Sequence, residues 1–323
     1  MTPVGKGGGV ARPSILFVLG VNRSGTSALA RVLSLCGGTL PPQLVGAMPD
    51  NPLGHWEPRA ANYLNEAILQ RHRSTMFDPT LRLQEDGAFD AEERSAWVNE
   101  IRAFLSTLPA APLAVVIKDP RITLFFGLWS EAARLAGFDV MAVVTVRHPE
   151  EVMASVARRS PASRELSAAL WLKYNLLAER QTRTVPRVFV EYTNLLDDWR
   201  REVKRVSAAL GIDLNLLEEA AIDEFLRVDL RRQRHDGPVP EFFGSDWIST
   251  VYDGLCAIAR DEYWDQVVLD RVYGAYRASE RDFGVVFEDF RRFRRANRLY
   301  RPLLLKMNYK VLAMVNRRNR TWI

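Results

Sequence analysis

Four short apolar runs are separated along the chain by longer stretches in which apolar residues recur at helical spacing. The runs lie at 15–19, 112–118, 140–146 and 187–192. A strand with no polar alternation, as at 15–19, suits a parallel sheet that is covered on both faces. Strands that alternate with helical stretches indicate a doubly wound sheet. The pattern therefore predicts an α/β fold in which a doubly wound parallel sheet is flanked by helices.

Helices are expected between these strands and after them. They cover about 29–36, 59–71, 91–108, 122–136, 163–183 and 198–210. Glycines that are typical helix stops follow three of them, at Gly37, Gly137 and Gly211. A polar, proline-rich segment separates the first helix from the second. We expect one domain at 14–290 whose C-terminal part is largely helical.

A glycine-containing turn joins the first strand to the first helix. Residues 20–27 read Gly-Val-Asn-Arg-Ser-Gly-Thr-Ser, which has the spacing of a phosphate-binding loop but places Thr26 in the lysine position. Gly20 and Gly25 let the backbone approach a ligand, and the following helix N-terminus favours an anion. Nucleoside triphosphatases need that lysine at the β- and γ-phosphates. The loop is therefore P-loop-like but favours a donor with a different group at that end.

The composition excludes several classes of protein. With 323 residues and 47% hydrophobic content the chain can bury a large core. Cys36 and Cys256 are too few for a disulfide framework, and the four histidines lack zinc-ligand spacing. The apolar run after the glycine-rich N-terminus is too short for a signal peptide or a membrane span. We therefore expect a soluble, cytoplasmic protein with no metal site.

The net charge of +5 is unevenly distributed. Residues 291–323 contain eleven Lys or Arg and no Asp or Glu, whereas residues 1–290 carry a net charge of −6. Leucine, tyrosine and methionine interleave with these cations, as in amphipathic helices that bind membrane surfaces. An anionic membrane or a lipid-linked substrate is one candidate partner, and a helix that packs back on the domain is the alternative. No nucleic-acid-binding module accompanies the charge, so no nucleic acid partner is expected.

Charged residues close two of the predicted strands. Lys118-Asp119-Pro120-Arg121 follows the second run, and Arg147 follows the third, with Ser155 about two helical turns later. Ligands bind at the carboxyl ends of such strands, so these side chains are candidate contacts. The alternative for 118–121 is a structural ion pair at the domain rim. For Arg147 it is pairing with a glutamate at 150 or 151.

Together these motifs resemble the sulfotransferases that use 3'-phosphoadenosine 5'-phosphosulfate (PAPS). Residues 20–27 are similar to the 5'-phosphosulfate loop of that family, and 146–155 are similar to its 3'-phosphate site. Further similar stretches are 50–57, 117–121 and 190–195. The resemblance spans about residues 15–212, and the bacterial group with a helical C-terminal part is the most similar.

The resemblance implies a set of residues that contact PAPS or its product, adenosine 3',5'-bisphosphate (PAP). It places the phosphosulfate at the loop and the 3'-phosphate between Arg147 and Ser155, and it implies no metal. The implied donor contacts are Asn22, Arg23, Ser24, Gly25, Thr26, Ser27, Arg147 and Ser155. In the basic turn at 231–237, Arg231 and Arg234 are further candidates, and a solvated turn is the alternative.

The resemblance also implies catalytic residues. Lys118 corresponds to a lysine near the bridging oxygen of the donor. The catalytic histidine of the cytosolic enzymes is replaced here by Pro120, so the base must come from elsewhere. Glu57 is the first candidate, because a carboxylate can take the proton of an acceptor hydroxyl. His55 is the second, since imidazole titrates near neutrality. The structural alternatives are a capping charge for Glu57 and stacking on Trp56 for His55.

The sequence thus predicts a sulfotransferase that moves a sulfuryl group from PAPS to the hydroxyl of a glycan, a glycolipid or a small metabolite by in-line displacement. Two other classes stay open. One is a P-loop kinase or nucleotide hydrolase in which Lys118 serves the phosphates. The other is a non-catalytic nucleotide-binding protein that associates with a membrane peripherally through 291–323. No pattern in the sequence identifies the acceptor or the oligomeric state.

Overall fold

The computed structural model describes residues 12–48, 51, 53–109, 111–158, 162–215, 218–226 and 237–280. The chain forms two compact units, 1–273 and 274–323. In the second unit the described residues, 274–280, are helical and continue a helix that begins at residue 266. The expected boundary between 14–290 and 291–323 lies outside the described residues.

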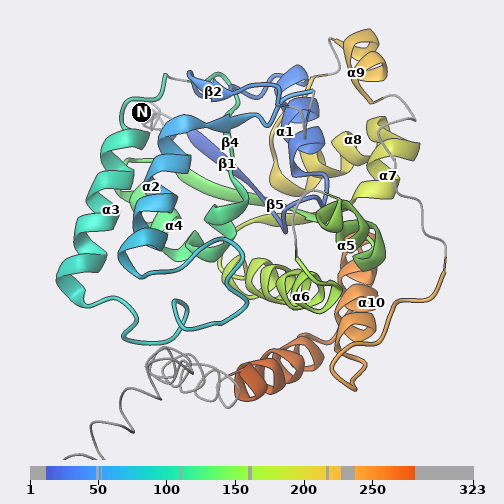
Figure 1. Ribbon diagram of the computed structural model, residues 1–323. Coiled ribbons are helices and arrows are strands. Elements are labelled where there is room, and N and C mark those ends of the chain that lie inside the picture. The colour runs from blue at the N-terminus through green and yellow to red at the C-terminus, as the bar shows by residue number, and fades with distance from the viewer. Residues whose placement is uncertain are drawn as a thin grey trace, which may run out of the picture. The chain divides into compact units, whose positions relative to one another are not determined.

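Four parallel strands form the central sheet, in the order β4 (Ala114–Lys118), β1 (Ser14–Leu19), β5 (Asp139–Val146) and β6 (Arg187–Glu191) (Figure 1). The chain passes from β1 to the strand on one side and then returns to the strand on the other side. The carboxyl ends of β1 and β5 therefore form the switch point, where open α/β sheets leave a crevice for ligands. The predicted doubly wound fold is confirmed.

Helices cover both faces of this sheet. On one face α1 (Thr26–Leu35) and α8 (Trp199–Leu210) pack on alternate strand residues such as Leu16 and Val143. On the other face lie α4 (Phe126–Leu135), α6 (Arg164–Gln181) and α10 (Trp247–Ala259). There the ring of Phe17 meets Phe126 and Trp129 edge-on, with centroids 5.8 and 6.2 Å away. Residues 15–19 are fully buried, which explains why their sequence shows no alternation.

The remaining elements occur along the chain between these strands and helices. They are β2 (Leu44–Val45), β3 (Glu57–Pro58), α2 (Arg59–Arg71), α3 (Ala91–Leu105), η1 (Pro120–Leu124), α5 (Pro149–Ala157), α7 (Tyr192–Asp197) and α9 (Glu219–Phe225). None of the helices in the described part of the chain has an apolar stretch of bilayer-spanning length.

The structure differs from the expected elements in three places. The single helix expected at 122–136 is divided into η1 and α4, because Asp119 caps a short 3-10 turn that ends at Phe125. The proline-rich segment 41–58 contains an antiparallel pair, β2 and β3. Six residues directly after β6 form the helix α7, which the sequence pattern did not predict.

A long loop at 72–90 is held against α6 by buried polar side chains. Lys173 donates to the carbonyl oxygens of Asp78 and Thr80 at 2.9 and 2.6 Å, and Tyr174 donates to that of Met76 at 2.9 Å. The Asp78 carboxylate accepts hydrogen bonds from the Ser74 hydroxyl and from Thr80. Burial opposes its charge, but these hydrogen bonds prevail and lower the pKa of Asp78. The loop is thus fixed at its centre.

Replacing the Asp78 carboxylate is expected to destabilise the protein. We predict that Asp78→Asn lowers the free energy of unfolding by about 1–2 kcal/mol at pH 7. Because the folded-state pKa lies below the unfolded value of about 3.9, the stabilising contribution is present above that pH and is lost as the pH falls through the folded-state pKa. Urea unfolding at pH 7 and at a series of pH values from about 4 down to about 2 measures the effect. Asp86→Asn, an exposed carboxylate of the same loop, is the control. A difference independent of pH would contradict the assignment.

Candidate functional site

The loop at 20–27 is fixed by the two strands beside β1. The Gly20 N–H donates to the Thr123 hydroxyl, which follows β4, at 3.1 Å. The Ser24 hydroxyl is fully buried, donates to the Val21 carbonyl at 2.7 Å and lies 2.6 Å from the Thr145 hydroxyl of β5. The hydroxyl of Ser24 therefore holds the loop in shape. The loop leads into a helix N-terminus as expected, but α1 begins at Thr26, three residues earlier than the sequence pattern indicated.

Gly25 is required by a contact with a distant residue. Its φ is +98°, and a Cβ at this position would lie 2.2 Å from the ring of Tyr192, the first residue of α7. The same ring faces Arg147, whose guanidinium carbon is 4.6 Å from the ring centroid. Tyr192 thus joins the loop to the end of β5, and the sequence analysis missed it because only the packing of α7 reveals the contact.

The structure places Arg23 beside Arg147 and Ser155, whereas the sequence analysis grouped only Arg147 with Ser155 and assigned Arg23 to the phosphosulfate. Arg23 Nε donates to Ser155 Oγ at 3.1 Å, and Arg147 Nη1 donates to the Arg23 carbonyl at 3.0 Å. Arg147 is 7% exposed and forms a 2.8 Å ion pair with Glu151. The pairing with a glutamate at 150 or 151, which the sequence analysis gave as the alternative for this arginine, is therefore present. The cations of this cluster are positioned beside the loop by buried partners.

A second cluster lies at the end of β4. Lys118 Nζ is 2.5 Å from Glu57 Oε1, 3.1 Å from Ser27 Oγ and 3.3 Å from the His55 carbonyl oxygen. Lys118 is 2% exposed and Glu57 is 7% exposed. His55 Nδ1 lies 4.0 Å from the Glu57 carboxylate. The three predicted catalytic residues therefore meet beside the hydroxyl of Ser27, at the N-terminus of α1.

Two asparagines of α2 belong to the hydrogen-bond network around the Glu57 carboxylate. Asn62 Nδ2 donates to Glu57 Oε2 at 3.1 Å and to Asp119 Oδ2 at 2.9 Å. Asn65 donates to the same Asp119 oxygen at 2.9 Å and accepts a hydrogen bond from Trp129. The sequence analysis missed both asparagines. Their spacing of three residues on one predicted helix was a signal that could have placed them on one face.

Arg121 completes this network. It donates to Asp119 Oδ1 and to Glu66 at 2.9 and 2.6 Å, and its Nη1 is 3.9 Å from Glu57 Oε2. Burial opposes the charge of Arg121, but the carboxylates of Asp119, Glu57 and Glu66 outweigh it and raise the pKa of the guanidinium. Arg121 therefore stays charged, and the rim ion pair considered for 118–121 is present.

Two of the predicted donor contacts cannot be placed. Arg231 and Arg234 lie outside the described residues. Asn22 is partly exposed at the tip of the loop, where its side chain lines a small cleft beside α5 and α6.

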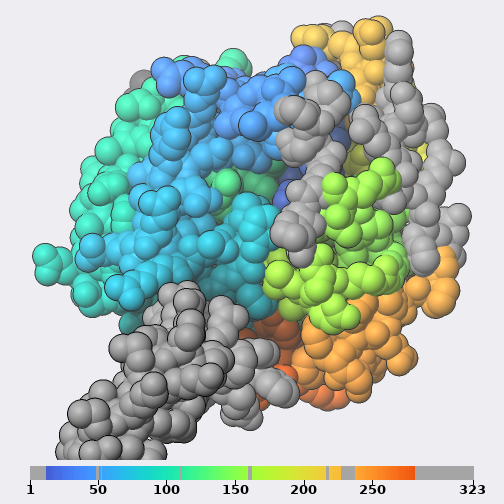
Figure 2. All heavy atoms as spheres, in the orientation of Figure 1, coloured from blue at the N-terminus to red at the C-terminus, as the bar shows by residue number. Residues whose placement is uncertain are grey.

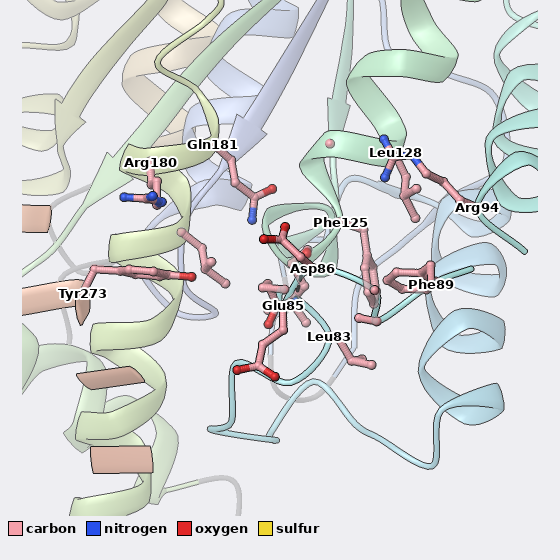
Figure 3. Close-up of a pocket in the computed structure, with 16 residues that line it drawn as sticks. Leu83, Glu85, Asp86, Phe89, Arg94, Phe125, Leu128, Arg180, Gln181 and Tyr273 are labelled. Carbon is pink, nitrogen blue, oxygen red and sulfur yellow. Dashed lines mark hydrogen bonds between the residues drawn. The ribbon is translucent and has the colours of Figure 1, made fainter. Parts of the chain in front are cut away.

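A separate hollow of about 510 Å³ contains none of the predicted site residues (Figure 3). It lies between the loop at 83–89, the start of α4 and the end of α6. Two of its arginines are paired, Arg180 with Asp270 and Arg94 with Glu131, each at 2.5 Å. This hollow is not the candidate site.

The arrangement is suited to binding an anion and to transferring a proton. Loop amides, a helix N-terminus and the Arg23–Arg147–Ser155 cluster suit an anion that carries phosphate groups. Beside them, Lys118 can neutralise negative charge on a leaving oxygen, and a carboxylate in hydrogen-bond contact with it can accept a proton. Acid–base chemistry next to an anion site is what group transfer from a phosphorylated donor needs.

Comparison with known proteins identifies relatives of this arrangement. Residues 13–215 match the family model described as the sulfotransferase family. No curated protein sequence matches the chain significantly.

Similar solved structures include three sulfotransferases. The sulfotransferase domain from the curacin biosynthetic pathway is 15% identical, with 79% of this chain and 100% of that chain covered and a TM-score of 0.43. Sulfotransferase STF9 from Mycobacterium avium is 15% identical, with 84% and 77% covered and a TM-score of 0.41. Mouse sulfotransferase SULT7A1, complexed with PAP, is 14% identical, with 86% and 89% covered and a TM-score of 0.37.

The contact between Gly25 and Tyr192 predicts a large effect of one methyl group. We expect Gly25→Ala to lower the free energy of unfolding by at least about 2 kcal/mol, because it adds both a clash and an unfavourable positive φ. Gly127→Ala is the matched control. Gly127 lies on the exposed face of α4 with open space around it, so alanine should stabilise by up to about 1 kcal/mol. Urea unfolding tests both, and a Gly25→Ala variant as stable as the parent would refute the contact.

Proposed function

The chain belongs to the sulfotransferase family, and we propose that it transfers a sulfuryl group from PAPS to the hydroxyl of a glycan, a glycolipid or a small metabolite. The observation that carries the proposal is the position of Lys118 Nζ, which lies 2.5 Å from Glu57 Oε1 and 3.1 Å from Ser27 Oγ. These groups lie beside a loop whose Arg23 contacts Ser155. A base, a cation for the leaving group and an anion cradle are then side by side.

The donor lies with its phosphosulfate on the loop and its 3'-phosphate at Ser155 and Arg147. Arg23 bridges the two regions, because its side chain reaches Ser155 while its backbone belongs to the loop. The amides at the start of α1 and the hydroxyls of Thr26 and Ser27 add further donors. Recognition of the 3'-phosphate distinguishes this donor from ATP.

Transfer proceeds by in-line displacement at sulfur. Glu57 takes the proton of the acceptor hydroxyl as the new S–O bond forms, and Lys118 neutralises charge on the phosphate oxygen that leaves. In the structure these two side chains neutralise each other at 2.5 Å. When Lys118 turns to the donor, Asn62 and Arg121 still hold Oε2 of Glu57, which leaves Oε1 to accept the proton. His55 is the second candidate for the base.

The proposal also includes a role for the basic C-terminal segment. Residues 291–323, which lie outside the described residues, would attach a cytoplasmic enzyme to an anionic membrane or a lipid-linked acceptor. The kinase alternative predicts a different ligand preference, and the non-catalytic alternative predicts no turnover. Binding and turnover experiments therefore test both.

Binding of adenosine 3',5'-bisphosphate tests the donor assignment. We expect it to bind at least about 30-fold more tightly than adenosine 5'-monophosphate, because the 3'-phosphate adds charge-assisted hydrogen bonds of about 2–3 kcal/mol. Arg147→Ala should remove most of this preference. Because that change also removes the ion pair of buried Glu151 with Arg147, the double variant Arg147→Ala/Glu151→Gln should be measured as well. Calorimetry provides the affinities.

Two controls make this experiment decisive. Arg158→Ala removes an exposed arginine at the end of α5 and should leave both affinities unchanged. ADP and ATP with magnesium should bind more weakly than the bisphosphate. Equal or tighter binding of ATP would contradict the donor assignment and favour a kinase or a nucleotide hydrolase.

Turnover tests the base. We predict that Glu57→Gln lowers kcat by about 10²- to 10⁴-fold, because the amide cannot accept the proton, while it leaves the affinity for the bisphosphate unchanged. Glu66→Gln, which removes a half-exposed carboxylate from the same Arg121, is the control and should retain most of the activity. If Glu57→Gln keeps full turnover and His55→Ala abolishes it, His55 is the base.

A further inference from the structure

The two chain neighbours of Trp56 both contact the same ammonium group. Lys118 Nζ lies 3.3 Å from the His55 carbonyl oxygen and 2.5 Å from Glu57 Oε1. The Ser27 hydroxyl donates to the same carbonyl oxygen at 3.2 Å. Trp56 lies between these contacts in the chain, so its backbone conformation decides whether both can form.

The backbone of Trp56 is left-handed, which is rare for a bulky residue. Its φ is +58°, and β3 begins at the next residue, Glu57. In an extended strand, the carbonyl of residue 55 would point along the hydrogen-bonding direction of the sheet, and the side chain of residue 57 would stand perpendicular to it. The left-handed turn between them allows both groups to reach Lys118.

Two unfavourable features coincide at Trp56. The left-handed conformation brings Cβ too close to the backbone. In addition, the indole Nε1 is buried and has no hydrogen-bond partner in the described part of the chain, which also costs free energy. Phenylalanine would avoid the second cost, and glycine would avoid both. Strained residues persist where their surroundings hold them in place, and they cluster at functional sites.

Three sets of contacts hold the indole ring. The guanidinium carbon of Arg31, on α1, lies 4.5 Å from the ring centroid. A Cβ at Gly54 would lie 3.3 Å from the indole, so the backbone there is close to the ring. The ring also packs against the core on the α1 face of the sheet. Figure 2 shows the segment 40–58, in blue, at the molecular surface beside α2, so inward contacts such as these anchor it.

We propose that Trp56 is a positioning residue for the transfer. Its anchored ring keeps the backbone at 56 left-handed, and this turn places the His55 carbonyl and the Glu57 carboxylate against Lys118. The role in transfer rests on the proposed function, whereas the placement of Lys118 does not. With the ring removed, the base and the ammonium group would no longer be held in one geometry before the donor and the acceptor bind.

Acetylation of lysine in the folded, full-length protein tests the placement. A buried amine reacts with acetic anhydride only when the structure around it opens, and Lys118 and Lys173 are 2% and 3% exposed. We expect Trp56→Gly to raise the rate at Lys118 at least about tenfold, because the ring no longer anchors the turn. The rate at Lys173, which binds the 72–90 loop, should not change. Trp56→Phe should leave both rates as in the parent. Mass spectrometry of peptides measures them.

Two further variants separate positioning from general stability. Arg31→Ala keeps the tryptophan but removes the cation over its ring, so it should raise the rate at Lys118 about two- to fivefold. This variant decides the question if Trp56→Gly does not fold. Trp199→Ala removes another tryptophan that packs in the same core and is the control for destabilisation. It should not favour Lys118 over Lys173. Equal rises at both lysines in Trp56→Gly, or no rise at Lys118, would overturn the proposal.

Turnover tests the role in transfer. Release of the bisphosphate from PAPS is measured with glucose, octyl glucoside and 4-nitrophenol as acceptors. We expect Trp56→Gly to lower kcat about 10- to 100-fold and to leave the affinity for the bisphosphate unchanged, because Arg23, Arg147 and Ser155 are untouched. Trp56→Phe should retain most of the activity. A parental kcat in Trp56→Gly would refute the role in transfer. A parent inactive with all three acceptors counts against the proposed function, and the acetylation rates then decide the placement alone.

Discussion

The buried ion pair between Lys118 and Glu57 is the interaction on which the rest of the site depends. Both residues are more than nine-tenths buried, and their charged groups lie 2.5 Å apart. Removing one partner of such a pair costs about 3–5 kcal/mol, because the other charge stays behind without compensation. The pair therefore ties the end of β4 to β3 and to the start of α1. Around it, Asn62 and Arg121 provide the remaining hydrogen bonds and charges that a buried carboxylate needs.

The same requirement explains how the candidate anion site is built. Arg147 is buried against Tyr192 and Glu151, so its charge is balanced and its position is fixed before any ligand arrives. Ser24 uses its hydroxyl inside the loop, and Thr145 of β5 and Thr123 of η1 hold the loop in place. Because the loop lies at the switch point of the sheet, core packing holds it rigidly.

Sequence patterns predicted the parts that are encoded locally. The strands at 15–19 and 140–146 and the helix at 59–71 are confirmed within one residue, because the period of apolar positions and the stop signals lie within each segment. The helix expected at 122–136 was wrong at its start, where Asp119 and Thr123 serve contacts outside the segment. The period of apolar positions contains no information about such contacts. For the same reason no strand was expected in the segment 41–58, although the sequence analysis named Glu57 and His55 in it; its antiparallel pair of β2 and β3 joins positions 12 and 14 residues apart.

The sequence by itself determined that a P-loop-like turn lies at the end of a buried strand and that cations close the neighbouring strands. These features follow from residue type and spacing over a few positions. Only the tertiary structure decided which groups meet: Lys118 contacts Glu57 across 61 positions, and Arg23 contacts Ser155 across 132. It also decided that Gly25 must lack a side chain because Tyr192 lies against it. The physical reason is that partners of buried charges and close approaches of backbone are set by how whole elements pack, and spacing along the chain does not record that packing.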